Sequence, residues 1–250
     1  MKRKGRCWIF ATDHKTGTVW QMNMSRVFCE ELGAQATWVS HREHPSIAAM
    51  PDRDYVVFFE RSFLFADSRW PEHPNLRGIR MVRDPRDVII SGAEYHARGS
   101  EAWLCEPQER FDGQSYSQQL QSLESQVDRL RFEMRHLAAR TIQEMAGPSD
   151  SRLQVIRYED LYSWETAPGC LLEISHWLEL DEDESRALTR AHSLTHLENQ
   201  STKPAHATRG TRTRWIDEWP SELDDEFATL FAKQIPYLPY ELPTQKNSGW

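Results

Sequence analysis

The sequence predicts an α/β protein with a central parallel sheet of about four to five strands flanked by helices. Two observations support this prediction. Short apolar runs, of the length of buried strands, alternate with longer segments in which apolar residues recur at helical spacing. The chain length of 250 residues suits one medium-sized hydrophobic core, so we expect a single domain covering residues 1–250.

The expected elements alternate along the chain. Strands are predicted at Cys7–Ala11, Ala36–Val39, Tyr55–Phe59, Ile79–Val82 and Leu153–Arg157. Helices are predicted from Trp20 to Leu32, through Asp87–His96 after Pro85, and as one long stretch over Tyr116–Ala146. Gly147 and Pro148 are typical of the end of that long helix. The remaining chain is expected to be helical, interrupted by the polar segment Gln200–Thr213.

Composition and charge exclude several classes of protein. Hydrophobic residues make up 39% of the chain and charged residues 27%, which is typical of a folded domain and not of a disordered chain. The net charge of −8 argues against a general nucleic-acid-binding protein. Since no segment approaches the ~20 apolar residues of a membrane span or the apolar core of a signal peptide, we expect a cytoplasmic protein. The four cysteines are widely spaced, which indicates reduced thiols and no zinc site.

The first candidate site is the turn Thr12–Thr18, between the first strand and the helix that follows it. Free backbone amides at the start of a helix attract anions, and the helix dipole adds partial positive charge. Lys15 supplies a full charge, Gly17 lets the backbone approach a ligand, and Thr16 and Thr18 offer hydroxyls. The turn therefore contains the parts of a phosphate cradle, with a solvated turn bearing a lysine as the alternative.

The second candidate site is the segment Arg83–Gly92, which follows a predicted buried strand. Arg83 ends that strand, where its side chain can reach a ligand at the sheet edge. Ser91 comes eight residues later, about two helical turns into the next helix. A guanidinium and a hydroxyl are good partners for a phosphate. The alternative is a surface helix cap with a structural arginine–aspartate pair.

Together the two segments resemble the motifs of sulfotransferases that use 3'-phosphoadenosine 5'-phosphosulfate (PAPS). His14–Trp20 is similar to the family's phosphosulfate loop, Pro-Lys-Ser-Gly-Thr-Thr-Trp, and departs from it at His14 and Val19. Arg83–Ser91 is similar to the family's 3'-phosphate motif, with the same arginine-to-serine spacing. The resemblance covers about residues 7–240. It implies the P-loop-like sulfotransferase fold and transfer of a sulfuryl group from PAPS to a hydroxyl or amine of a small acceptor, releasing 3'-phosphoadenosine 5'-phosphate (PAP) without a metal.

The resemblance also assigns ligand-binding residues. The phosphosulfate loop corresponds to Lys15, Thr16, Gly17, Thr18, Val19 and Trp20, and the 3'-phosphate motif to Arg83 and Ser91. Three shorter matches add Tyr158 at the adenine, Ser193 and Leu194 near that base, and Arg209 and Gly210, followed by Trp215, in a loop that clamps the 3'-phosphate. Leu194 stands where the family has an aromatic residue, so stacking on the base is expected mainly from Trp20.

The catalytic groups follow from the chemistry of sulfuryl transfer. Lys15 is expected to neutralise charge that builds on the leaving 5'-phosphate. The family's histidine base is missing from Val57–Phe63, and Glu60 is the nearest substitute unless it forms an ion pair with Arg61 or another cation. The other candidate bases are His41, His44 and His96. An amine acceptor of low pKa would need less help from a base.

Two other functions compete with the sulfotransferase hypothesis. The first is a nucleotide or metabolite kinase, which the missing Gly-x-x-x-x-Gly-Lys order opposes. The second is an inactive PAPS- or PAP-binding protein, which the missing histidine favours. We expect a small-molecule acceptor as the partner, with neither nucleic acid nor membrane, and leave a homodimer open.

Overall fold

The computed structural model describes residues 5–39, 54–60, 75–99, 101–199 and 213–244. The chain divides into two compact units. The first unit contains Met1–Arg83 and Pro148–Arg212, and the second contains Asp84–Gly147 and Thr213–Trp250. The expectation of one domain for the whole chain stays a prediction. None of the described helices combines the length and the apolar character needed to cross a membrane.

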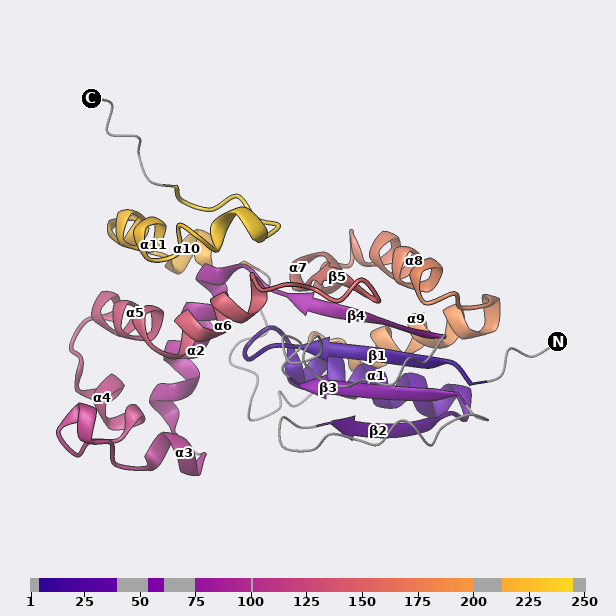
Figure 1. Ribbon diagram of the computed structural model, residues 1–250, viewed down its shortest axis with the longest axis horizontal. Coiled ribbons are helices and arrows are strands. Elements are labelled where there is room, and N and C mark those ends of the chain that lie inside the picture. Colours follow the sequence, from indigo (N-terminus) through magenta and orange to yellow (C-terminus); the bar gives the residue numbers. More distant parts are fainter. Residues whose placement is uncertain (1–4, 40–53, 61–74, 100, 200–212, 245–250) are drawn as a thin grey trace. The chain divides into compact units, whose positions relative to one another are not determined.

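A parallel sheet forms the centre of the first unit (Figure 1). Among the described residues it has five strands in the order β2-β3-β1-β4-β5. The strands are β1 Cys7–Thr12, β2 Gln35–Val39, β3 Tyr55–Glu60, β4 Leu76–Val82 and β5 Leu153–Arg157. The predicted α/β class is therefore confirmed, and each expected strand lies within two or three residues of its predicted position.

The central strands β1 and β3 are buried along nearly their whole length, which explains why they are continuous apolar runs in the sequence. Along β1, Trp8 and Phe10 belong to a core cluster with Met24 and Phe28 of the following helix. The alternate residues of β1 belong to a separate cluster, with side chains of β3, β4 and β5. Since successive strand residues point to opposite faces, a strand buried on both faces needs apolar residues at nearly every position.

Four helices of the first unit lie in the described residues: α1 Thr18–Leu32, α7 Tyr158–Tyr162, α8 Ala167–Trp177 and α9 Glu182–Thr195. α1 packs against α9 and against β1 and β3 (Figure 1). α1 ends at Gly33, whose φ of 60° is a left-handed conformation that suits glycine. α9 begins with a capping box, in which Asp181 and Glu184 each accept a backbone amide of the other.

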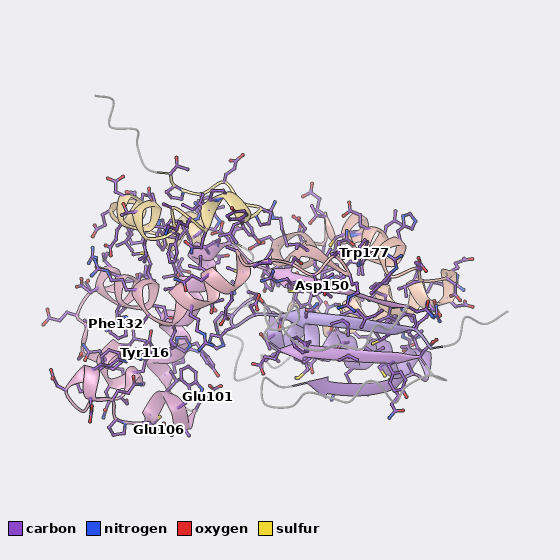
Figure 2. All side chains as sticks on the ribbon, in the orientation of Figure 1. Glu101, Glu106, Tyr116, Phe132, Asp150 and Trp177 are labelled. Carbon is purple, nitrogen blue, oxygen red and sulfur yellow. The ribbon has the colours of Figure 1, made fainter. Side chains whose placement is uncertain are left out.

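The described part of the second unit is helical. Its α-helices are α2 Pro85–Arg98, α3 Ala102–Cys105, α4 Tyr116–Ser122, α5 Gln126–Arg135, α6 Leu137–Met145, α10 Trp215–Glu218 and α11 Asp224–Leu230. Short 3-10 helices lie at Glu109–Phe111, Ser221–Leu223 and Ile235–Tyr237. Tyr116 and Phe132, labelled in Figure 2, pack with their ring centroids 5.1 Å apart and join α4 to α5.

The prediction of one long helix over residues 116–146 is wrong, because the segment forms three helices. Ser125 starts α5 by accepting the amide of Asp128 with its side chain, 3.0 Å away. At His136 the imidazole Nδ1 lies 2.7 Å from the carbonyl of Phe132, which an uninterrupted helix would use for the amide of His136. That amide instead donates to the carbonyl of Glu133, and α5 ends before His136. Side chains that compete for backbone partners thus end helices whose apolar spacing continues.

Candidate active site

The order of the strands creates a topological switch point between β1 and β4. After β1 the chain builds β2 and β3 on one side, and it then places β4 on the other side. Thr12, the last residue of β1, pairs in register with Glu60 of β3 and Met81 of β4. In parallel α/β sheets, ligands bind outside the carboxyl ends of the strands at such a point. Lys15 follows β1 and Arg83 follows β4, so both lie beside the switch point.

The turn after β1 is organised around the backbone of Asp13. Its carbonyl accepts the amide of Thr16 at 3.3 Å and the hydroxyls of Thr16 and Thr18 at 2.9 and 3.0 Å. Its amide donates to Thr16 Oγ1 at 3.0 Å. Both hydroxyl hydrogens are therefore used inside the turn, whereas the sequence suggested that they face a phosphate. The backbone amides that begin α1 and the side chain of Lys15 belong to the same turn.

The backbone of the turn leaves the first amides of α1 without partners inside the helix. Lys15 and Gly17 both have positive φ, 63° and 102°. Gly17 is the N-cap of α1, and it provides no side-chain cap for the amides of Thr18, Val19 and Trp20, which have no partners within the helix. The first helical hydrogen bond runs from the amide of Gln21 to the carbonyl of Gly17, 2.9 Å. The positive end of α1 thus lies next to Lys15, which favours an anionic ligand.

Gly17 is also required by close packing. A Cβ at this position would lie 2.9 Å from Cδ2 of Tyr158 and 3.0 Å from Sδ of Met81. Tyr158 is the first residue of α7 and is itself buried. The turn can lie this close to the α7 side chain only because residue 17 has no side chain.

Arg83 contacts the same turn. Its guanidinium lies over the ring of Tyr158, 4.7 Å from the centroid, and Nη1 donates to the carbonyl of Lys15 at 3.3 Å. Of the residues predicted to bind the ligand, the first unit therefore brings together Lys15, Gly17, Arg83 and Tyr158. These residues come from the ends of β1 and β4 and from the start of α7.

Trp20 is 2% exposed and lies in a cluster of aromatic rings. The centroids of its neighbours are 5.6–5.9 Å away and belong to Tyr158, Tyr162, His192 and His196. Side chains of the protein therefore pack around Trp20, the ring on which the sequence led us to expect a base to stack. Ser193 and Leu194 are exposed near the end of α9, and Leu194 is 57% exposed.

Two histidines of this cluster were not singled out by the sequence. His192 Nε2 donates to the carbonyl of Leu161 at 2.8 Å, and His196 Nε2 donates to that of Tyr162 at 2.7 Å. Burial lowers the pKa of His192, and the neighbouring His196 lowers it further. Their four-residue spacing at the end of α9, on either side of Ser193, is the sequence signal that could have identified them.

Three charged residues that follow Arg83 in the 3'-phosphate motif, Asp84, Arg86 and Asp87, make structural contacts in the second unit. Asp84 caps α2 and binds the side chain of Arg86 through both carboxylate oxygens, at 3.0 and 2.7 Å. The Arg86 guanidinium lies 3.4 Å from the ring centroid of Trp215, whose amide donates to Asp87 at 2.8 Å. Ser91 is buried within α2. Arg209 and Gly210 lie outside the described residues, but Trp215, which follows them, is held against α2.

The candidate bases lie in different places. Glu60 ends β3 beside Thr12 and is half-buried, while His41 and His44 lie outside the described residues. His96 of α2 is fully buried, with Nδ1 3.0 Å from Oε2 of Glu133. The Tyr116 hydroxyl donates to the same carboxylate oxygen at 2.9 Å. Among the described residues, no three His, Cys, Asp or Glu side chains gather in a metal-binding arrangement.

Comparisons with known proteins reveal similarity in structure and not in sequence. No protein-family model matches this chain, and no curated protein sequence matches it significantly. Among solved structures, mouse sulfotransferase SULT7A1 complexed with PAP is similar over 91% of this chain and 84% of its own, with a TM-score of 0.58 and 16% sequence identity.

Retinol dehydratase is also similar, in two crystal structures. Its complex with retinol and PAP matches 97% of this chain and 85% of its own, with a TM-score of 0.55 and 14% identity. Its complex with androsterone and the inactive cofactor PAP matches 94% of this chain and 82% of its own, with a TM-score of 0.53 and 14% identity. The predicted fold is confirmed: this chain has the sulfotransferase fold.

Proposed function

We propose that this protein is a PAPS-dependent sulfotransferase, which transfers a sulfuryl group to a hydroxyl or amine of a small acceptor and releases PAP. The main support is the position of Lys15 and Arg83 at the switch point of a sheet with the sulfotransferase fold. The three solved structures described above contain PAP, which supports the same nucleotide for this chain.

The 5'-phosphosulfate is proposed to bind at the start of α1. The amides of Thr18, Val19 and Trp20 and the ammonium of Lys15 supply hydrogen bonds and positive charge to it. Arg83 is proposed to bind the 3'-phosphate. In the structure its guanidinium donates to a neutral carbonyl at 3.3 Å, and a phosphate oxygen would be a stronger acceptor. Ser91, Tyr158, Ser193, Leu194, Arg209 and Gly210 keep the ligand roles that the sequence resemblance assigns to them.

Catalysis is proposed to rest on positioning and charge. The acceptor oxygen or nitrogen forms a bond to sulfur as the bond between sulfur and the 5'-phosphate oxygen breaks. Negative charge builds on that leaving oxygen, and Lys15 with the first amides of α1 stabilises it. Glu60 is proposed as the general base that removes the proton of the acceptor. Its position beside Thr12 puts a carboxylate at the same end of the sheet as the Lys15 turn.

The proposed nucleotide can be tested by thermal unfolding with PAP, AMP and ATP. Saturation at a hundredfold excess over Kd should stabilise the fold by about 2.7 kcal/mol, or roughly 5–10 °C for a chain of this size. We expect this shift with PAP and a much smaller one with AMP, which lacks the 3'-phosphate. Equal shifts with PAP and AMP would refute the proposed 3'-phosphate site. A larger shift with ATP than with PAP would favour a kinase.

A further inference from the structure

We infer that Arg80 is a positioning residue of the anion site, which cancels the charge of Asp13 and so allows the turn built on Asp13 to bind an anion. The inference rests on the proposed function only in identifying that anion as the 5'-phosphosulfate of PAPS.

Arg80 and Asp13 form a buried ion pair next to the anion-binding turn. Arg80 Nη2 lies 3.2 Å from Oδ2 of Asp13, and the two side chains are 2% and 0% exposed. Arg80 pairs in register with Ala11 of β1, two residues before Asp13, so both charges lie at the carboxyl ends of adjacent strands. Burying a charge is expensive unless an opposite charge and hydrogen bonds compensate it, and this ion pair brings an opposite charge to each residue.

Asp13 determines the shape of the turn through its backbone. Its carbonyl accepts three hydrogen bonds from Thr16 and Thr18, and its amide donates a fourth to Thr16. The amide of Thr18 and the ammonium of Lys15 belong to the same short segment.

The charge of Asp13 would by itself oppose the function of the turn. Its carboxylate lies two residues from Lys15 and has no direct access to water. A negative charge ~8 Å from a bound anion, at an effective dielectric constant of ~20, weakens binding by about thirtyfold. The guanidinium of Arg80 cancels that charge, so Lys15 and the positive end of α1 determine the field at the site.

The ion pair could act by cancelling charge or only by holding the turn in shape. These two explanations predict opposite changes in PAP affinity for Asp13→Asn. In Arg80→Leu a positive charge beside the turn is lost and the Asp13 carboxylate stays, so PAP should bind about tenfold to a hundredfold more weakly. In Asp13→Asn the guanidinium remains, so PAP should bind more tightly than to the wild type. The double variant Asp13→Asn/Arg80→Leu should return to within about threefold of the wild type. If the pair served only to hold the turn in shape, all three variants would bind more weakly.

The test is a calorimetric titration of the full chain and its variants with PAP, and with inorganic pyrophosphate as a second probe. Arg6→Leu is the control, because it removes an arginine that binds Asp54 at 2.7 Å and Glu184 at 2.5 Å at the opposite end of β1, and it should not affect either anion. Circular dichroism and urea unfolding establish that each variant is folded. If a single variant does not fold, Arg80→Lys, which keeps the charge, and the double variant decide, and both should bind within about threefold of the wild type.

The outcomes separate this inference from the proposed function. A folded double variant that loses more than about tenfold in affinity, or a folded Asp13→Asn that binds more weakly than wild type, overturns the role of Arg80. If the wild type binds pyrophosphate but not PAP, the proposed nucleotide is wrong. The affinities of the variants for pyrophosphate then test the role of Arg80. If it binds neither anion, both the proposed function and the inference are overturned.

Discussion

Replacing Gly17 by alanine tests whether the turn depends on close packing against α7. The new Cβ would lie 2.9 Å from Cδ2 of Tyr158 and 3.2 Å from Cε2 of the same ring. Tyr158 cannot easily move away, because its ring is buried and contacts Trp20, Tyr162 and Arg83. The substitution therefore forces either the turn or the core of the first unit to shift.

The expected cost has two parts. A left-handed backbone costs a non-glycine residue ~1–2 kcal/mol, and overpacking a filled site costs a further ~1–3 kcal/mol. Gly17→Ala should thus destabilise the protein by about 2–5 kcal/mol and lower Tm by roughly 5–15 °C. Gly33→Ala is the matched control, because Gly33 also has positive φ, 60°, but a Cβ there meets no atom within 4 Å.

The assay is urea unfolding of both variants, together with a PAP titration. Gly33→Ala should lose only ~1–2 kcal/mol and bind PAP normally, whereas Gly17→Ala should lose more and bind PAP at least about tenfold more weakly. If the two alanine variants were equally stable and bound PAP equally well, the packing of the turn against Tyr158 would have no role in the site.

Three further predictions concern single side chains. Arg83→Ala should raise the KM for PAPS more than it lowers kcat, because the 3'-phosphate is remote from the reacting sulfur. Arg77→Ala, which replaces an arginine of β4 whose side chain is 40% exposed, should change neither constant. Glu60→Gln should keep PAP affinity but slow transfer by roughly two to four powers of ten, and an unchanged rate and pH profile would exclude Glu60 as the base. Because burial lowers the pKa of His192, its unfolded form takes up a proton below about pH 6.5 while the folded form stays neutral, so stability should fall as the pH falls through that range. Urea midpoints at about pH 7.5 and about pH 5.5 should differ less in His192→Gln, and an identical difference in both proteins would refute this role of His192.

The strands and the first turn could be predicted from the sequence because their signals are local. A buried parallel strand is a short apolar run, and Lys15 and Gly17 follow the first such run directly. The break at His136 could not be predicted, since it depends on which donor the carbonyl of Phe132 accepts. The same limit applies to the hydrogen bond from the Thr16 hydroxyl to the carbonyl of Asp13 inside the turn.

The role of Asp13 and Arg80 could not be predicted because it depends on two strands that lie side by side. In the sequence, Arg80 is a single charge within the apolar run Ile79–Val82, and Asp13 is one polar residue of a turn. Only the pairing of β1 with β4 brings their side chains to 3.2 Å. A charged residue within a buried strand is nevertheless a usable signal, because it predicts an opposite charge on a neighbouring element.

The most direct test of the proposed function is the release of PAP from PAPS carrying a radioactive sulfur atom. The protein is incubated with this PAPS and with each of a phenol, a primary alcohol and an aromatic amine, and PAP and the sulfated product are measured together. We expect PAP release in step with sulfation of at least one acceptor, and a loss of about two to four powers of ten in Lys15→Ala, which should still bind PAP. Sulfation at an equal rate by wild type and Lys15→Ala, or a wild type that binds PAP but transfers no sulfuryl group to any of the three acceptors, would contradict the proposed function.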